Sequence, residues 1–194
     1  MSQAAGRVPV IKTRKKILTY DDYAALTPPD GSNSELHNGK LIFIPSPTPR
    51  HQDVVMNLSA RMYFHASTKG LGKVYHAPLD TKFDEINTFQ PDILFISKKR
   101  VSIISQKKIE GAPDMVVEIL SEGNTPKEMS YKKYIYESHY VQEYWLINLR
   151  KSTVTVYQNT EGELMPLGVF THNDLVESKV LTGFKISVKD ILNV

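Results

Sequence analysis

Acidic side chains follow proline at the entry to two similar segments in the middle of the chain. Residues 90–97 and 112–121 each contain a Pro-Asp step, an apolar and largely β-branched run, and a serine. A run of this kind predicts a buried strand. Proline is tolerated there because the first residue of a strand need not donate to the ladder. The sequence therefore predicts two buried strands, which are entered through Asp92 and Asp114.

The second run also contains Glu118, a carboxylate flanked on both sides by apolar residues. An unpaired charge in such a place is costly, because a buried ion loses its hydration. A buried salt bridge or a backbone-capping role would compensate the charge, and so would a bound divalent cation. The cation would also give the charge a chemical use.

A cation at Glu118 needs a second acid. Asp114 is four residues from Glu118 on the same strand, and at ~3.3 Å per residue its Cα is ~13 Å away, which makes it a poor co-ligand. Asp92 reaches Glu118 if the two strands lie side by side. The sequence permits that adjacency and does not prove it.

Local signals near the start of the chain predict a short helix followed by a hairpin. Thr19 caps the helix, and Asp22 is placed to bond back to it. Asn38-Gly39 is the strongest short hairpin signal, because both residues tolerate positive φ. Glu35 is expected on the first strand of that hairpin.

Apolar residues at helical spacing predict two longer helices. The first covers about residues 50–67, with His51 in its first turn. We interpret His51 as a partly buried hydrogen-bonding residue, and a metal-proximal or substrate-facing role is the alternative. The second covers about residues 125–138, where Lys132 shares a partly apolar stripe and Lys133 is less constrained. A lysine on such a stripe is more often an extended stem than a catalyst. The start of this helix combines three signals, which are Thr125, Pro126 and Glu128.

Further strands are predicted from apolar or alternating patterns at residues 73–76, 79–83, 143–148, 152–157 and 164–170. The basic run Lys98-Lys99-Arg100 lies between the two acidic strands. Such a run is usually a solvated face. If Asp92 and Glu118 hold a metal, the run could instead contact a phosphate backbone near the strand ends.

Composition indicates one globular domain. The chain has 194 residues, of which 41% are hydrophobic, enough for a sizeable core. Residues 1–16 carry a charge of +5 and the whole chain +3, which leaves −2 for residues 17–194. We therefore expect a basic tail over 1–16 and a single domain over 17–194.

No apolar run approaches the ~20 residues that cross a bilayer and no secretory signal is apparent, so we expect a cytoplasmic protein without a membrane partner. The lack of cysteine excludes disulfides and thiolate metal sites.

Several motifs, in order along the chain, carry a resemblance to a known family. They are residues 35–41 (ELHNGKL), 45–52 (PSPTPRHQ), 90–92 (QPD), 110–114 (EGAPD), 116–121 (VVEILS) and 143–145 (EYW). This succession resembles the Uma-two (Uma2, DUF820) family of restriction endonucleases, within the PD-(D/E)xK nuclease superfamily, over nearly the whole chain after residue 16. The resemblance implies an α/β fold of mixed α+β character, with a restriction-endonuclease-like core, a mixed β-sheet flanked by helices, and an N-terminal β-hairpin.

The resemblance also implies a metal site. In the superfamily, an Asp at the start of one strand and a Glu on the next bind Mg²⁺, and a Lys two residues after the Glu helps the attacking water. Carried over by motif, Asp92 and Glu118 become ligands of Mg²⁺ or Mn²⁺, with the backbone carbonyl of Ile119 or Val117 as an extra ligand. The usual lysine position is Leu120 here, so the motif is incomplete in linear form.

In the Uma-two pattern the lysine lies on the helix after the Glu strand, and alignment backward from residues 143–145 places it at Lys132. Glu35 matches an acidic position of the family, as a support for the ligands or as a third carboxylate. His51 and Gln52 are expected near the substrate.

The function that the resemblance implies is Mg²⁺-dependent hydrolysis of DNA phosphodiester bonds. It also implies DNA as a partner and a homodimer, since cutting two strands favours two sites. Two other classes stay open. One is a non-catalytic module on the same fold that binds nucleic acid or protein, and the other is a structural protein in which Glu118 forms a buried ion pair.

Overall fold

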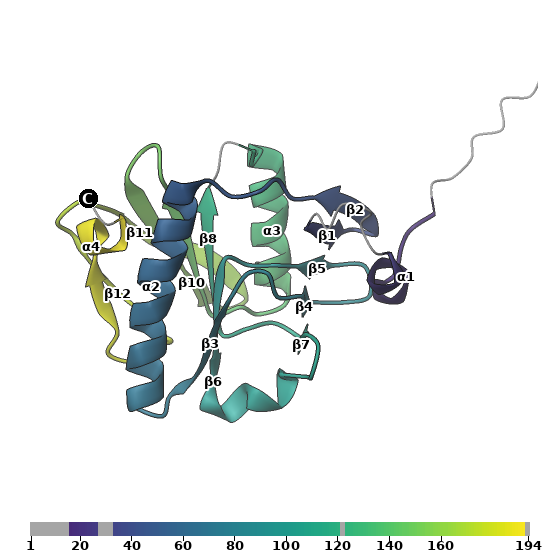
Figure 1. The fold of residues 1–194 in the computed structure, drawn as a ribbon. Coiled ribbons are helices and arrows are strands. Elements are labelled where there is room, and N and C mark those ends of the chain that lie inside the picture. Colours follow the sequence, from purple (N-terminus) through teal and green to yellow (C-terminus); the bar gives the residue numbers. More distant parts are fainter. Residues whose placement is uncertain (1–15, 27–32, 121–122, 193–194) are drawn as a thin grey trace, which may run out of the picture.

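The structure, a computed structural model, describes residues 16–26, 33–120 and 123–192 (Figure 1). Its central element is a six-stranded mixed sheet in the order β11-β10-β9-β8-β6-β3. These strands are β3 (Gly72–His76), β6 (Ile93–Ser97), β8 (Met115–Leu120), β9 (Glu143–Asn148), β10 (Thr153–Thr160) and β11 (Glu163–Thr171). Strands β8 and β9 are parallel, and the other neighbours are antiparallel.

Two long helices flank this sheet, α2 (Pro49–Thr68) and α3 (Pro126–Ser138) (Figure 1). Side chains alternate along β8, so that Val117 and Ile119 belong to the core cluster that contains α2, whereas Val116 belongs to the cluster that contains α3. Glu118 has the parity of Val116 and therefore faces the α3 side. A strand that is buried on both faces explains why its sequence is apolar almost without interruption.

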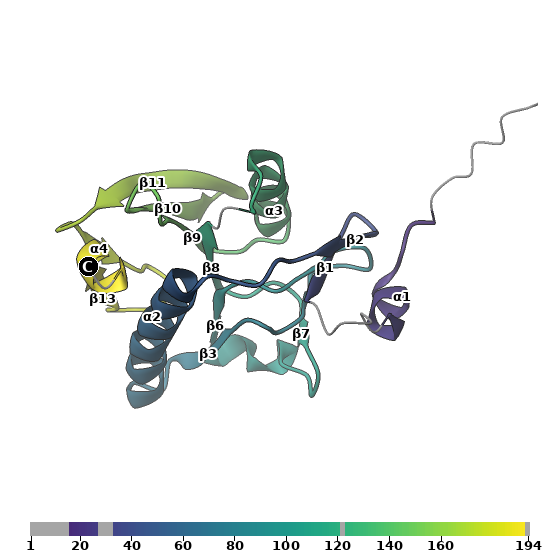
Figure 2. The same ribbon diagram turned by 45° about the horizontal axis from the view of Figure 1, so that its top comes forward.

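A second, five-stranded sheet has the order β2-β1-β5-β4-β7. It lies beside α1 at the end of the molecule that is distant from α4 (Figure 2). Its elements are β1 (Ser34–His37), β2 (Lys40–Phe43), β4 (Thr81–Lys82), β5 (Thr88–Phe89) and β7 (Ile109–Glu110), and the neighbouring helix is α1 (Tyr20–Ala25). The 3-10 helix η1 (Lys98–Ile103) follows β6.

The C-terminal part forms a two-stranded sheet of β12 (Leu175–Glu177) and β13 (Lys185–Ser187), followed by α4 (Val188–Leu192). Its apolar residues join the core cluster of α2 and the central sheet. They include Phe184, Ile186, Val188, Ile191 and Leu192.

The strongest local signals are confirmed. Thr19 and Asp22 form a reciprocal capping box, and Asn38 and Gly39 adopt φ of 49° and 68° in the turn between β1 and β2. The Thr125 side chain accepts from the backbone N of Glu128 at 3.2 Å and so caps α3.

The shortest elements were not predicted. Strands β5 and β7 have two residues each and β12 and β13 have three each, which is too short for a periodic pattern. The strand predicted over residues 79–83 is reduced to Thr81–Lys82. The predicted tail, residues 1–16, lies outside the described residues except for Lys16, whose Nζ is 2.7 Å from Asp22 Oδ1.

Candidate active site

The two predicted acids lie on neighbouring strands. In the antiparallel pair of β6 and β8, Ile93 is opposite Val117, so the residue before β6, Asp92, comes next to Glu118. Asp92 Oδ2 accepts a hydrogen bond from the backbone N of Ile119 at 2.7 Å. The adjacency that a shared cation requires is therefore present.

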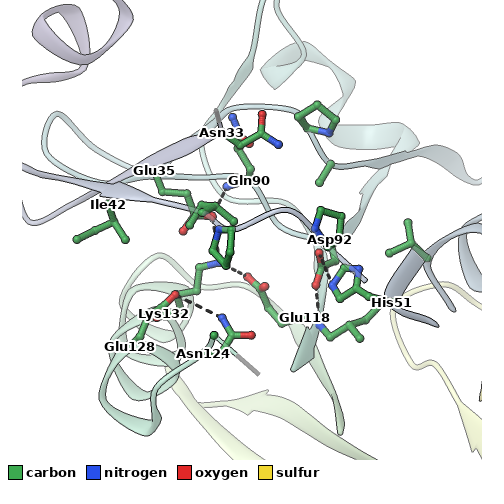
Figure 3. Close-up of a pocket in the computed structure, with 18 of the residues that line it drawn as sticks. Asn33, Glu35, Ile42, His51, Gln90, Asp92, Glu118, Asn124, Glu128 and Lys132 are labelled. Carbon is green, nitrogen blue, oxygen red and sulfur yellow. Dashed lines mark hydrogen bonds and ion pairs between the residues drawn. The ribbon is translucent and has the colours of Figure 1, made fainter. Parts of the chain in front are cut away.

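Lys132 reaches these acids from α3. Its Nζ lies 2.9 Å from Glu118 Oε1 and 3.0 Å from Glu35 Oε1 (Figure 3), and the residue is only 4% exposed. Its neighbour Lys133 turns elsewhere, because its Nζ pairs with Glu137 at 3.2 Å. Of the two lysines left open by the sequence, the structure places Lys132 among the acids.

Glu35 comes from the N-terminal hairpin. Its Oε1 accepts from the backbone N of Gln90 at 2.7 Å, and its Oε2 lies 2.7 Å from Nε2 of His37. Together with Lys132, three polar groups surround this 1%-exposed carboxylate. Both oxygens of Glu35 are thus already engaged by protein groups.

Glu118 has a second partner on α3, since the hydroxyl of Tyr136 donates to Glu118 Oε1. Burial raises the pKa of Glu118, the charges of Asp92 and Glu35 raise it further, and Lys132 and Tyr136 only partly oppose them, so that the pKa is about 7. A carboxyl at such a pKa binds a proton readily when no cation replaces that proton.

The pKa of Glu35 moves the other way. Burial alone would raise it, but Lys132 and His37 outweigh burial and lower the pKa of Glu35 to about 2. For Lys132, burial alone would lower the pKa, and the two carboxylates reverse this and raise it. Lys132 is therefore a cation, and Glu35 is its permanent anionic partner.

His51 lies in the first turn of α2, beside Asp92. Its Nε2 lies 3.2 Å from Asp92 Oδ1. Burial would lower its pKa, yet Asp92, Glu118 and the Ile119 backbone raise it. The other ring nitrogen, Nδ1, is buried and has no hydrogen-bond partner within the described part of the chain. His51 is thus a partly satisfied polar group next to the acid pair, as both interpretations of this residue allowed.

These side chains line one cavity of about 160 Å³ (Figure 3), which has room for several water molecules. All the predicted site residues line it, namely Glu35, His51, Gln52, Asp92, Glu118, Ile119 and Lys132. They come from β1, α2, the entry to β6, β8 and α3, so residues that are remote in the sequence converge here.

The donor set suits a hard divalent cation. No group of three or more His, Cys, Asp or Glu side chains that could hold a metal occurs in the described ranges, so Asp92 and Glu118 would need other oxygen ligands. The N–H of Ile119 points to the Asp92 side of β8, and the C=O of the same strand residue points to that side too. Mg²⁺ needs few protein ligands because it retains several waters. The residues fit this ion, with Asp92, Glu118 and the carbonyl of Ile119 as ligands and water in the cavity.

The structure does not support one alternative. The run Lys98-Lys99-Arg100, interpreted as a solvated face or as a phosphate contact near the metal site, forms the start of η1, after the last residue of β6. Asp92 precedes the first residue of that strand, so the run lies at the opposite end of the sheet. Arg100 pairs there with Asp114, at 3.4 Å.

Sequence reasoning missed three groups that hold the site together. Tyr136 lies one helical turn after Lys132 in α3. His37 lies two residues after Glu35 on the same face of β1. The backbone N of Gln90 has no sequence signal at all, because its role depends on the approach of β1.

Comparison with known proteins agrees with the resemblance. The model of the Uma2 family, described as "Putative restriction endonuclease", matches residues 20–189. The chain belongs to the Uma2 family. Among solved structures, it is similar to the crystal structure of a "putative nuclease belonging to DUF820" from Anabaena variabilis ATCC 29413, with a TM-score of 0.76 and 22% identity over 91% of this chain and 98% of that one. This likeness confirms the predicted fold class.

No curated protein matches the Uma2 chain. None of its helices within the described ranges is long and apolar enough to span a membrane.

Proposed function

We propose that this Uma2 protein is a Mg²⁺-dependent (or Mn²⁺-dependent) endonuclease that hydrolyses DNA phosphodiester bonds. The observation that carries the proposal is the position of Lys132. Its Nζ is 2.9 Å from Glu118 Oε1, and Glu118 lies next to Asp92 on the neighbouring strand. Two acids on adjacent strands and a buried cationic side chain are the groups that a metal-assisted hydrolysis needs. The membership of the Uma2 family supports the choice of substrate.

The proposed roles follow from the contacts. Asp92 and Glu118 bind the cation, and when bound it supplies Lewis-acid stabilisation of the phosphate charge and a more acidic water. Lys132 holds the attacking water and the phosphate oxygens in place. The water oxygen forms a bond to phosphorus and gives up one proton to solvent, the bond from phosphorus to a sugar oxygen breaks, and that sugar oxygen takes up a proton from solvent.

Glu35 acts on Lys132 and not on the cation. Its oxygens are engaged by Lys132, Gln90 and His37, so it fixes the lysine at the floor of the cavity. We therefore assign Glu35 as a positioning residue, in place of a third metal ligand.

A second candidate is a non-catalytic module that binds nucleic acid or protein. The observation in its favour is that Lys132 and Tyr136 already compensate the charge of Glu118. In such a module Glu118, Lys132 and Tyr136 would stabilise the fold and would hydrolyse no phosphodiester bond, with or without a cation. A homodimer in the cytoplasm remains part of the endonuclease proposal, and the mass of the purified protein in solution tests the dimer.

The test is a cleavage assay on supercoiled and linear DNA with Mg²⁺, Mn²⁺ or a chelator. Wild type is compared with Asp92→Ala, Glu118→Ala and Lys132→Ala, and Lys133→Ala is the matched control because that lysine pairs outside the cavity. We expect cation-dependent nicking that falls by about 100-fold or more in the three site variants and is kept in the control. Calorimetric titration of Mn²⁺ into wild type and Glu118→Ala accompanies the assay. Equal cutting by all variants would point to a contaminant, and cation binding without cutting would favour the binding module.

A further inference from the structure

The cavity of the proposed active site has two chemically different parts. Its floor holds the buried charged groups Glu35, Glu118 and Lys132. The larger part of its rim is formed by the end of β2 and the segment that leads to α2, and this part is apolar. The rim residues are Ile42, Phe43, Ile44, Pro45 and Pro47.

The residues that line the cavity include few of the charges that grip a duplex. Of the described residues that line the cavity, Lys132 is the only lysine or arginine, and two carboxylates hold it at the floor. Proteins that bind duplex DNA engage its phosphates largely through lysine and arginine. The basic run of η1 lies at the far end of β6, and residues 17–194 have a net charge of −2. The cavity itself thus offers few phosphate contacts to a continuous duplex.

Phe43 is the main aromatic group of the rim. It is 60% exposed although it belongs to a strand, so its ring is available to a ligand at the mouth of the cavity. An exposed aromatic ring beside a catalytic site is a stacking surface for a base that is not paired, because every base has a π-face. Bases within a duplex already stack on their neighbours and cannot use it.

Amide side chains complete the rim. Asn33 and Gln52 both line the cavity and are exposed. An amide offers a donor and an acceptor to the edge of a base. An unpaired base has that edge free, whereas a paired base uses it for its partner.

The acids themselves are recessed. The side chain of Asp92 is 16% exposed and that of Glu118 is 7% exposed. A flexible single strand can bring one phosphate to recessed acids, whereas a duplex presents two backbones and a rigid helix. The depth of the acids therefore favours the same substrate as the rim does.

From this arrangement we propose that the cavity accepts unpaired nucleotides, so that the substrate is single-stranded DNA or the single-stranded part of a duplex with an overhang. A base stacks on Phe43 at the rim while the adjoining phosphate lies at the cation site that Asp92 and Glu118 would form. This inference rests on the proposed nuclease function.

The experiment uses the full-length chain with three fluorescent DNAs of one sequence, a single strand, a blunt duplex and a duplex with an overhang. Binding is measured by anisotropy with Ca²⁺ in place of Mg²⁺, and cleavage is measured with Mg²⁺. We expect the single strand and the overhang to be bound and cut about 10-fold or more better than the blunt duplex. Phe43→Ala lowers this preference about 10-fold, and Phe43→Trp keeps it.

The control variant is Phe64→Ala, which removes a phenylalanine that is 70% exposed on α2 and does not line the cavity; it is expected to change nothing. If the blunt duplex is cut as well as the single strand, or if Phe43→Ala has no effect while Asp92→Ala abolishes cutting, the inference fails and the nuclease proposal stands. If no DNA is bound or cut with any cation, the nuclease proposal fails and the inference falls with it.

Discussion

Asp92 and Asp114 follow proline in nearly identical local sequences, but they lie in different environments. Asp92 lines the cavity with Glu118, whereas Asp114 accepts from the backbone N of Ser97 at 2.8 Å and pairs with Arg100. Both precede a buried strand, and the two strands are antiparallel. The entry of one strand therefore lies beside the exit of the other, and the two aspartates are at opposite ends of the pair. The antiparallel direction of β6 and β8, and not the local motif, brings Asp92 beside Glu118, whereas Asp114 is too distant along β8.

The most direct test of this difference between Asp92 and Asp114 is to exchange each aspartate for its amide. Asp92→Asn should lower the rate of cation-dependent DNA cleavage by about 100-fold or more, because a cation ligand loses its charge. Asp114→Asn should leave the rate within about 2-fold, provided that the assay temperature is below its melting temperature. A large loss of cleavage in Asp114→Asn alone would show that the wrong end of the strand pair has been assigned to the chemistry.

The two lysines of α3 offer a second comparison, in stability. Lys132→Met removes the ammonium group that pairs with both Glu35 and Glu118 and should lower the free energy of unfolding by about 3 kcal/mol. The matched change Lys133→Met removes an ion pair at the helix surface and should cost about 0.5 kcal/mol or less.

Urea denaturation with and without Mn²⁺ sharpens this result. If Asp92 and Glu118 hold the cation, Mn²⁺ should restore part of the stability of Lys132→Met, because binding to the native state shifts the unfolding equilibrium. An equal loss in both lysine variants, or no response to Mn²⁺, would contradict the assigned site.

The carboxylates on either side of Lys132 should respond to pH with opposite signs. The pKa of Glu35 is lowered to about 2, so its contribution to stability is present above its unfolded pKa and is lost as the pH falls toward 2. The pKa of Glu118 is raised to about 7, so the metal-free protein loses stability as the pH rises through the range between the ordinary carboxyl pKa and 7.

Urea denaturation of wild type, Glu35→Gln and Glu118→Gln at several pH values measures both effects. The stability difference between wild type and Glu35→Gln should shrink by up to about 3 kcal/mol at low pH, whereas Glu118→Gln should become relatively more stable as the pH rises. Glu85→Gln, at a 67%-exposed side chain outside the cavity, is the control. Parallel curves for all three variants would mean that the pKa values of Glu35 and Glu118 are not shifted in opposite directions.

The smallest expected effect concerns the far end of the sheet. Arg100→Met removes the partner of Asp114, and because the arginine side chain is 37% exposed the loss of stability should be about 1 kcal/mol or less. DNA binding and its dependence on salt should stay unchanged, since η1 lies away from the cavity. A reduced salt dependence of binding in this variant would restore the basic run as a phosphate contact.

Much of the local structure was predictable because it depends on neighbouring residues. The turn at Asn38-Gly39 needs two residues that tolerate positive φ, and the chain supplies them. The cap at Thr125 and the stripe that carries Lys132 follow from helical geometry. The short strands β5 and β7 could not be predicted, because they exist only through pairing with β1 and β4.

The sequence by itself determined the buried strands, the apolar surroundings of Glu118 and the helix face of Lys132, since spacing along one chain fixes which side chains share a face. Only the tertiary structure decided that Asp92 lies beside Glu118, that Lys132 and not Lys133 enters the cavity, and that Glu35 is held by Gln90 and His37. These contacts join segments that are far apart in the chain, and their formation depends on the direction of strand pairing and on the packing of α3, which no local pattern encodes.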